Sequence, residues 1–266
     1  MSDKPTNKYP PKGPSRGRNS APERLWLYGR HAVAAALANP ARKFRRLAAT
    51  KNAVDWLNER DEIQNWQSRI GKGFEDLRPD AIDKLLPAGA VHQGLAAEVL
   101  ELPRTRLKEV CSFKDDAHRP VVILDQITDP QNIGAILRSA AAFKARAVIV
   151  QERRTPPLSG ALAKAAAGAL EIVPIVQAVN IARSVEALND LGYLTAGLAS
   201  SAPTAIADLP KTCPIALVMG AEGAGLRQLV GETCQTLIHI PIDAQMESLN
   251  VSVAAAISLY AVSQPT

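Results

Sequence analysis

The most constraining feature of this sequence is a regular alternation of short apolar runs and helical patterns that begins at residue 120. Residues 120–127 (PVVILDQI) form an apolar run typical of strands buried on both faces. Residues 132–143 follow with apolar side chains at helical spacing, and the alternation continues to a last helix pattern over 249–263. Strands that alternate with helices predict an α/β domain with a mostly parallel sheet. Ligands of such sheets bind beyond the carboxyl ends of the strands.

The first part of the chain has a different texture. Residues 1–21 are rich in Pro, Gly, Ser, Lys and Arg, which predicts a disordered basic arm. Residues 22–102 carry a compact α/β pattern whose first helix ends at Asn39-Pro40. Residues 103–118 begin with Pro and are highly charged, so we predict a linker there. The second domain is then expected over 119–266.

Charge is divided unevenly along the chain. Residues 1–119 hold 22 Lys and Arg against 15 Asp and Glu, whereas residues 120–266 hold 9 against 11. A basic half joined to a slightly acidic half suggests that the first half binds a polyanion, and the alternative is a soluble protein with a basic tail. The cations of residues 42–46 (ARKFRRLAAT) can be read as an RNA backbone contact or as a solvated face.

Composition disfavours several classes of protein. No run of 18 apolar residues is present, so we expect no membrane span. The N-terminus lacks the apolar core of a signal peptide, which predicts a cytoplasmic protein. Cys111, Cys213 and Cys234 show neither metal-ligand spacing nor even pairing, and the four histidines are scattered. No metal site is therefore predicted.

Three predicted strand-end loops hold side chains that could support chemistry. In the first, residues 124–143, Asp129-Pro130 forms a turn and Asn132 is a good helix cap. Gly134 would let a ligand approach the first turn of the helix closely. Arg138 lies at the edge of the apolar stripe, where a plain surface arginine is an equal alternative.

The second loop follows the buried strand pattern of residues 216–226 (ALVMGAEGAGL). Gly220, Gly223 and Gly225 permit sharp turns and expose backbone groups to a ligand. The Gly-Lys-Ser/Thr of a phosphate-binding loop is missing, as is the Gly-x-Gly-x-x-Gly fingerprint, which makes a nicotinamide dehydrogenase a poor fit. Glu222 would repel a phosphate and better suits a hydroxyl, a cation or an arginine.

The third loop, residues 240–254 (IPIDAQMESLNVSVA), gathers polar residues at the front of an apolar helix. Capping explains Ser248 well, because a serine hydroxyl accepts from free backbone N–H groups in the first turn. Capping explains Asn250 and Ser252 poorly, since polar groups on a core-facing helix must find partners. These residues are therefore expected to face a site.

Together the three loops resemble the SpoU/TrmH family of RNA ribose 2′-O-methyltransferases, within the SPOUT superfamily. The family's three motifs appear in order as Asn132, Gly134 and Arg138; Gly220 to Gly223; and Ile240, Pro241 and Ser248 to Ser252. The resemblance covers about residues 120–262. A weaker match, in YGRHAVAAAL and HQGLAAEV, is similar to the small L30e-like RNA-binding domain of the family's 23S rRNA (guanosine-2′-O-)-methyltransferase branch, RlmB.

The resemblance implies a trefoil-knotted domain, a homodimer and S-adenosylmethionine as cofactor. By position, the backbone of Gly220, Ile240 and Leu249 would hold the cofactor, with Met219 and Ala199 nearby. The substrate would be a guanosine ribose of 23S rRNA. A tRNA methyltransferase remains an alternative, as does a non-catalytic RNA-binding or ribosome-assembly protein that keeps the knot.

The family assigns Arg138 to the ribose hydroxyl, whose proton must leave as the oxygen attacks the methyl carbon. Arginine is normally protonated, so Arg138 acts either as an unusual base or as a stabiliser of the developing alkoxide. Asn132 and Glu222 would orient Arg138 and the ribose. We expect Ser248 to cap the last helix and Asn250 to support the site, with Ser252 as a partner for either.

Overall fold

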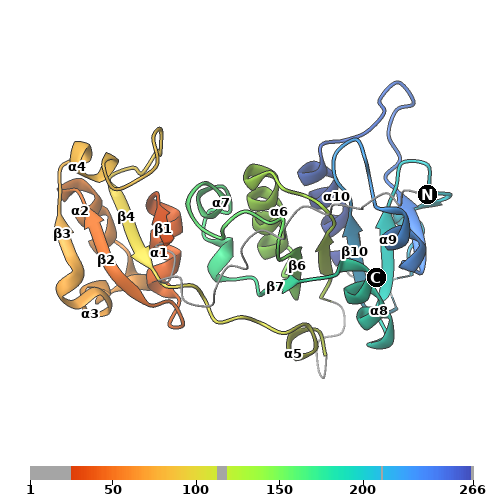
Figure 1. Cartoon of the computed structure of the whole chain (residues 1–266), viewed down its shortest axis with the longest axis horizontal. Coiled ribbons are helices and arrows are strands. Elements are labelled where there is room, and N and C mark those ends of the chain that lie inside the picture. Colours follow the sequence, from red (N-terminus) through yellow and green to blue (C-terminus); the bar gives the residue numbers. More distant parts are fainter. Residues whose placement is uncertain (1–24, 113–118, 211, 265–266) are drawn as a thin grey trace, which may run out of the picture.

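The computed structural model describes residues 25–112, 119–210 and 212–264. The basic arm predicted over residues 1–21 lies outside them. The described chain forms two sheets that lie at different places along the long axis of the molecule, one from the first part of the chain and one from the second (Figure 1). Both parts combine helices with strands, which confirms the predicted α/β class.

The first sheet has four strands. In spatial order they are β1 (Leu25–Tyr28), β4 (Leu95–Val99), β2 (Phe44–Ala49) and β3 (Phe74–Asp76). Strand β4 is antiparallel to both of its neighbours, and β2 is parallel to β3. The helical segments of this part are α1 (Arg30–Ala38), α2 (Lys51–Asn58), η1 (Asp61–Ile63), α3 (Trp66–Ile70), η2 (Gly71–Gly73) and α4 (Pro79–Asp83).

The second sheet has seven strands. In spatial order they are β7 (Ile175–Ala178), β6 (Ala147–Gln151), β5 (Val121–Leu124), β10 (Ile215–Met219), β8 (Leu194–Leu198), β11 (Thr236–His239) and β9 (Thr204–Ala205). All the strand pairs between these described segments are parallel, as the alternating sequence pattern predicted. That the chain threads a knot stays a prediction from the family resemblance.

Helices cover both faces of this sheet. Successive strand residues point to opposite sides, and in β5 the residues of both sides are apolar and pack against helices. Val122 and Leu124 of β5 join one apolar cluster with α6 (Pro130–Ala142), α7 (Gly160–Ala165) and α10 (Val251–Ser263). Val121 and Ile123 join another with α5 (Leu107–Cys111), α8 (Ile181–Asp190) and α9 (Gln228–Thr233). Two short turns, η3 (Ala169–Glu171) and η4 (Ile206–Asp208), complete the described elements.

Two helix caps differ from the predictions. Asp129, not Asn132, caps α6, because its carboxylate accepts from the backbone N–H groups of Gln131 and Asn132 while Pro130 takes the first helical position. Asn250, not Ser248, caps α10, since the chain becomes helical only at Val251. In both places the cap is the residue that directly precedes the first helical turn.

The segment predicted as a linker contains a short helix. Leu107 and Val110 of α5 pack against the apolar cluster of the second sheet, and the side chain of Cys111 is fully buried there. The hydroxyl of Tyr193 donates to the carbonyl oxygen of Cys111 at 3.0 Å. The charged residues around α5 concealed this small apolar face in the sequence.

Candidate active site

Polar side chains from three distant segments meet near the carboxyl ends of β5 and β10. Nδ2 of Asn132 donates to Oε1 of Glu222 at 3.2 Å, and Nδ2 of Asn250 donates to the same oxygen at 2.7 Å. Asn250 Nδ2 also lies 3.1 Å from Oδ1 of Asn132. The backbone N–H of Val251 is a third donor to Glu222, at 3.3 Å. Three predicted site residues thus form one group, which we call the amide–carboxylate cluster.

The orientation of the Asn250 amide is set by its second role as a helix cap. Its Oδ1 accepts from the backbone N–H groups of Ser252 at 2.9 Å and Val253 at 3.4 Å, and from the Ser252 hydroxyl at 2.6 Å. With the oxygen held in this way, the amide nitrogen points to Glu222 and Asn132. Capping, which the sequence analysis judged a poor explanation for Asn250, is therefore an observed role of this residue, and Ser252 is its partner.

Glu222 lies at the tip of a tight glycine turn after β10. Ala221 and Gly225 exchange two backbone hydrogen bonds, at 3.1 and 2.8 Å, and Gly223 and Gly225 have φ of 76° and 66°. At Gly220 an added Cβ would lie 2.1 Å from the backbone carbon of Gly225, so only glycine fits. The glycines of this loop thus make the turn that presents the carboxylate.

An ion pair between a buried carboxylate and a half-exposed arginine, absent from the sequence predictions, fixes the end of this turn. Asp125 is fully buried and accepts from Arg227 Nε at 2.9 Å, Arg227 Nη2 at 2.6 Å and the Arg227 backbone N–H at 3.1 Å. The Asp125 N–H donates to the carbonyl oxygen of Met219 at 2.8 Å. The sequence did offer a signal, because Asp125 comes directly after a strand of wholly apolar side chains. A carboxylate buried at that position must be paired, so a cationic partner could have been expected.

The same carboxylate affects a neighbouring thiol. Burial, with the Asp125 charge adding to it, raises the pKa of Cys234 to about 12. The Cys234 thiol therefore stays protonated near neutral pH and is not a candidate nucleophile, since only the thiolate is reactive.

A pocket of about 350 Å³ adjoins the amide–carboxylate cluster. Its lining includes Glu222 and Ser248. It also includes all five residues predicted to surround the cofactor, which are Ala199, Met219, Gly220, Ile240 and Leu249. These residues end or follow β8, β10 and β11, or precede α10, so the pocket lies at the carboxyl edge of the sheet, where ligands of parallel sheets bind.

The charge of the pocket lining limits what it can bind. Glu222 and Glu247 line it, and none of the lining residues is a lysine or an arginine. Apolar side chains such as Met219, Ile238 and Leu249 supply the walls. This lining suits an organic ligand with positive charge better than a nucleotide polyphosphate.

Two predicted residues stand apart from the cluster. Arg138 is exposed on α6 and, among the described residues, makes no hydrogen bond or ion pair. It follows Asn132 by six residues, which places it about 9 Å along the helix and about 120° around it. Ser248 is exposed in the loop before α10 and reaches the pocket without capping the helix.

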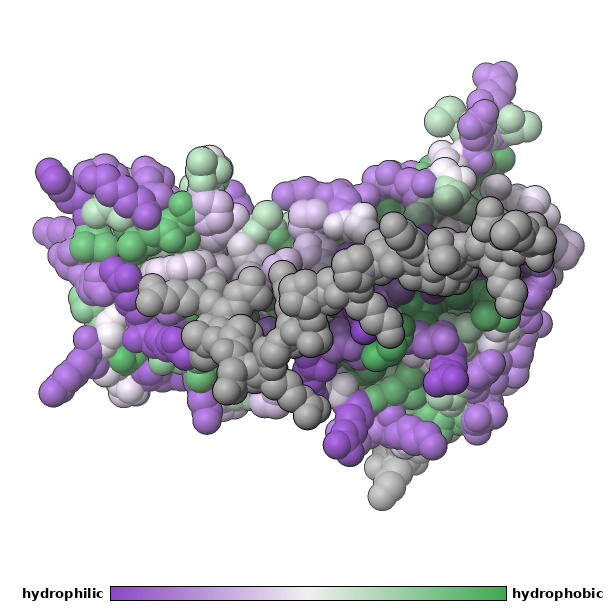
Figure 2. All heavy atoms as spheres, viewed as in Figure 1, coloured by the Kyte–Doolittle hydropathy of each residue, from purple (hydrophilic) through white to green (hydrophobic). Residues whose placement is uncertain are grey.

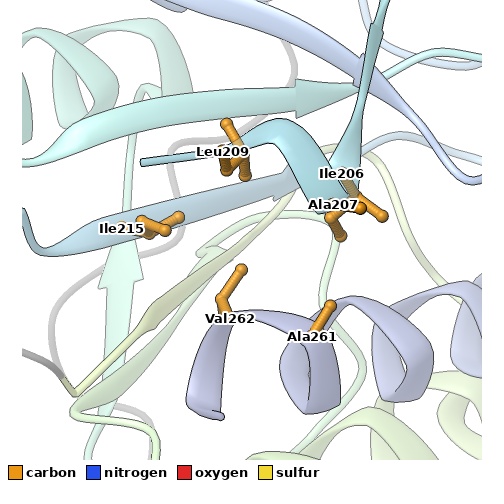
Figure 3. Close-up of a pocket in the computed structure, with 6 residues that line it drawn as sticks. All are labelled: Ile206, Ala207, Leu209, Ile215, Ala261 and Val262. Carbon is orange, nitrogen blue, oxygen red and sulfur yellow. The ribbon is translucent and has the colours of Figure 1, made fainter. Parts of the chain in front are cut away.

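A second cavity, of about 220 Å³, has no polar chemistry. Figure 3 shows its lining side chains, which come from η4, β10 and the end of α10 and are all aliphatic: Ile206, Ala207, Leu209, Ile215, Ala261 and Val262. Over residues 25–112, 119–210 and 212–264 there is also no group of three or more His, Cys, Asp or Glu that could hold a metal ion. The amide–carboxylate cluster and its pocket are therefore the candidate site.

Comparisons with known proteins identify the family of the chain. The family model described as SpoU rRNA Methylase matches residues 119–260, and one described as RNA 2′-O ribose methyltransferase substrate binding matches residues 26–104. The chain is 37% identical to the 23S rRNA (guanosine-2′-O-)-methyltransferase RlmB of Vibrio cholerae, over 88% of this chain and 94% of that protein. It is 35% identical to the RlmB of Coxiella burnetii, over 89% and 94%.

Solved structures share the fold. The SpoU methyltransferase AviRb of Streptomyces viridochromogenes superimposes with a TM-score of 0.73 and 23% identity, over 90% of this chain and 88% of that chain. An AdoMet-bound rRNA methyltransferase of Sinorhizobium meliloti gives 0.74 with 21% identity, over 90% and 86%. With the matched family models and the relatives above, the chain belongs to the SpoU rRNA methylase family.

Proposed function

We propose that this protein transfers a methyl group from S-adenosylmethionine to the ribose 2′-hydroxyl of a guanosine in 23S rRNA. The observation that carries the proposal is the amide–carboxylate cluster of Asn132, Glu222 and Asn250 beside a pocket without lysine or arginine. A cationic sulfonium is compatible with that lining, and relatives named for this reaction match most of the chain.

The residues of the cluster would position the hydroxyl. Oε1 of Glu222 already accepts three hydrogen bonds, whereas no described residue donates to its Oε2. Oε2 can therefore accept from the ribose hydroxyl and hold the oxygen in line with the methyl carbon, and alignment of this kind supplies much of a rate enhancement. The sulfonium of the cofactor provides the methyl group and its own leaving group.

The family resemblance assigns Arg138 to the same oxygen, although its side chain stands apart from the amide–carboxylate cluster in this structure. Its guanidinium is exposed and unpaired among the described residues, so it is available to a bound RNA. We assign it to the alkoxide, either as the group that takes the proton or as a cation that stabilises the charge. Ala199, Met219, Gly220, Ile240 and Leu249 would surround the cofactor, with Ser248 at its edge.

The RNA would also contact a cationic aromatic group on the first sheet's helices. The Arg60 guanidinium carbon lies 3.8 Å from the centroid of the Trp56 ring, and that of Arg30 lies 5.4 Å from it. His31 meets the same ring edge-on at 6.0 Å. Guanidinium groups stacked on an indole can still donate N–H groups to phosphate oxygens, although Nη1 of Arg60 already donates to Glu62 at 2.8 Å. Hydrophilic residues dominate the outline of this part of the molecule (Figure 2).

We also propose a homodimer that acts in the cytoplasm, where ribosomal RNA is found. Val253, Ile257 and Tyr260 form an exposed apolar stripe on α10, with 47%, 39% and 56% of their surfaces exposed. A stripe at this spacing on one helix face is typical of a protein interface. Light scattering should give twice the chain mass, and Tyr260→Glu with Ile257→Glu should give monomers. Among the described helices, none has the length and apolarity of a membrane span.

The decisive experiment is methyl transfer from labelled S-adenosylmethionine to unmodified 23S rRNA, 16S rRNA and tRNA in parallel. Arg138→Ala serves as the inactive control, and the product nucleotide is mapped. A 2′-O-methylguanosine in 23S rRNA that the control lacks is the expected result. If label appeared on tRNA alone, tRNA would replace 23S rRNA as the proposed substrate. Binding of S-adenosylmethionine without methyl transfer to any of the three RNAs would contradict the proposal for free RNA. If the protein did not bind S-adenosylmethionine at all, the non-catalytic RNA-binding protein would be the better interpretation.

A further inference from the structure

The two parts of the chain are joined by an ion pair that is almost completely buried. Arg42 follows α1 in the first part, and Glu171 ends η3 in the second. Arg42 Nη2 lies 2.6 Å from Oε1 of Glu171, and Arg42 Nε lies 3.1 and 3.2 Å from the two carboxylate oxygens. Only 2% of the arginine side chain and 3% of the glutamate side chain are exposed. The arginine that the sequence offered as an RNA contact is therefore used inside the protein.

Two further groups beside this pair are hydrogen bonded to it. Nδ2 of Asn39 donates to Oε2 of Glu171 at 2.8 Å, and Nη1 of Arg42 donates to the carbonyl oxygen of Leu100 at 2.8 Å. Arg69 holds the loop that carries both donors, because its Nη2 lies 2.7 Å from the carbonyl oxygens of Asn39 and Arg42. A network this complete gives the loop one conformation against Glu171.

Close backbone packing surrounds the ion pair. Gly168 has φ of 93°, and a Cβ placed on it would lie 2.6 Å from Cβ of Ala35 in α1. Gly160, at the start of α7, faces the ring of Tyr28 in β1, with 3.6 Å between the ring carbon Cε1 and an added Cβ. Helix α7 and turn η3 therefore pack closely against β1 and α1 (Figure 1).

The other side of α7 packs on the helix that carries the site. A Cβ added to Gly134 of α6 would lie 2.4 Å from Cβ of Ala165 and 2.9 Å from the backbone nitrogen of Ala166. Gly134 is two residues from Asn132, whose amide belongs to the amide–carboxylate cluster. Helix α7 thus connects the first sheet to the first turn of α6 by direct contact on both sides.

We infer that Arg42 and Glu171 are positioning residues that hold the RNA-binding part of the chain at one fixed orientation to the methyl-transfer site. This inference rests on the proposed function, since it concerns delivery of a bound RNA. A buried ion pair is weak evidence for added stability, because desolvation offsets the attraction between the charges. The directional hydrogen bonds of the pair instead specify one docking geometry, and RNA held by residues 26–104 meets the amide–carboxylate cluster in that geometry.

The test uses the full chain with Glu171→Ala, Arg42→Ala, the double variant and the milder Glu171→Gln. Glu75→Ala is the matched control, because it breaks the Arg46–Glu75 ion pair within the first sheet. For each protein one measures S-adenosylmethionine affinity by calorimetry, kcat and KM with a 23S rRNA fragment, and the radius of gyration by X-ray scattering. Glu171→Gln keeps a hydrogen-bonding oxygen for Arg42 and Asn39, so it should restore part of the activity lost in Glu171→Ala.

The expected result is a loss of about tenfold or more in kcat/KM for Glu171→Ala. Its cofactor affinity should stay within about twofold of the wild type, and its radius of gyration should increase. The double variant should have the same kcat/KM as either single variant, since each single substitution already breaks the Arg42–Glu171 interaction. Kinetics and scattering equal to those of the wild type would overturn the inference, as would a parallel loss of cofactor affinity. A wild-type protein that transfers no methyl group would instead refute the proposed function, and scattering would still test the fixed orientation.

Discussion

At the scale of single residues, the site depends on one carboxylate oxygen that satisfies three donors. Glu222 Oε1 accepts from two side-chain amides and one backbone N–H, and these donors come from α6 and from the start of α10. The arrangement leaves each amide with one orientation. The chemistry of the site therefore depends on the acceptor character of Glu222 as much as on its charge.

Replacing Glu222 by Gln tests this dependence. A glutamine has the same shape but turns one acceptor into a donor, which faces the Nδ2 groups of Asn132 and Asn250 or the ribose hydroxyl. We expect methyl transfer to fall about a hundredfold through misplacement of the reacting hydroxyl. Single-turnover assays at saturating cofactor would measure it. Glu247→Gln, in the same pocket lining, is the control and should keep most of the activity. Equal losses in the two variants would refute the role of Glu222.

A buried thiol gives a prediction for alkaline pH. Burial raises the pKa of Cys111 from 9.0 to about 11, so the folded chain keeps a proton that the unfolded chain loses near pH 9. The stabilisation is fully present below pH 9 and is lost as pH rises toward 11. Cys111→Ala should therefore remove about 2 kcal/mol of the fall in unfolding free energy between pH 8 and 10.5. Urea denaturation across this range measures it, and an unchanged pH slope would contradict the assignment.

At the scale of elements, α6 and α7 approach each other through a glycine. Alanine is normally the better helix residue, but the space at Gly134 is already occupied by Ala165 and Ala166 of the facing segment. Gly231 in α9 is the opposite case, because an added Cβ there meets nothing within 4 Å. The two glycines allow the same substitution to be compared in a crowded and in an open helix.

Gly134→Ala should lower the free energy of unfolding by about 1–3 kcal/mol, since overpacking outweighs the gain in helix propensity. Gly231→Ala should raise it by about 0.5–1 kcal/mol through the lower entropy of the unfolded chain. Chemical denaturation measures both. A stabilised Gly134→Ala protein would show that the helices can separate without cost, and the contact between α7 and the first turn of α6 would then be soft.

The elements were largely predictable, whereas several contacts were not. Alternation of apolar runs and helical patterns identified the parallel sheet because both periodicities are local. Asn132, Glu222 and Asn250 were named as site residues because they lie in strand-end loops and match the family motifs, but their hydrogen bonds to one another were not predicted. The pairing of Arg42 with Glu171 could not be predicted, since it joins residues far apart in the chain and a run of cations resembles a solvated face. The helix α5 was hidden by the charges around it.

At the scale of the whole molecule, the excess of positive charge and the candidate pocket belong to different parts of the sequence. Residues 1–119 carry the excess of lysine and arginine, and the pocket lining contains neither. The arrangement separates binding of a polyanion from binding of a cationic cofactor. The two affinities should therefore respond differently to ionic strength.

The affinity for a 23S rRNA fragment should fall steeply with salt, with a log–log slope of roughly −0.7 to −0.9 for each phosphate contacted. Arg30→Ala combined with Arg60→Ala should make that slope shallower by about 1 to 2, and Arg183→Ala, an exposed change on α8, should leave it unaltered. Filter binding between low and physiological salt measures the slopes. A flat dependence for the wild type would contradict the assignment of the basic part to RNA.

The strand order of the large sheet has a consequence for how the protein is made. Strand β10 is the central strand of the sheet, yet it is the sixth of the seven strands in chain order. Until β10 is synthesised, β5 and β8 each present an unpaired edge, and open edges of parallel strands are sites of wrong association. Contacts between segments so far apart in the chain also form slowly. The large sheet should therefore depend on chaperones for longer than the small first sheet does. Most aggregation during expression should begin from chains that end before residue 219.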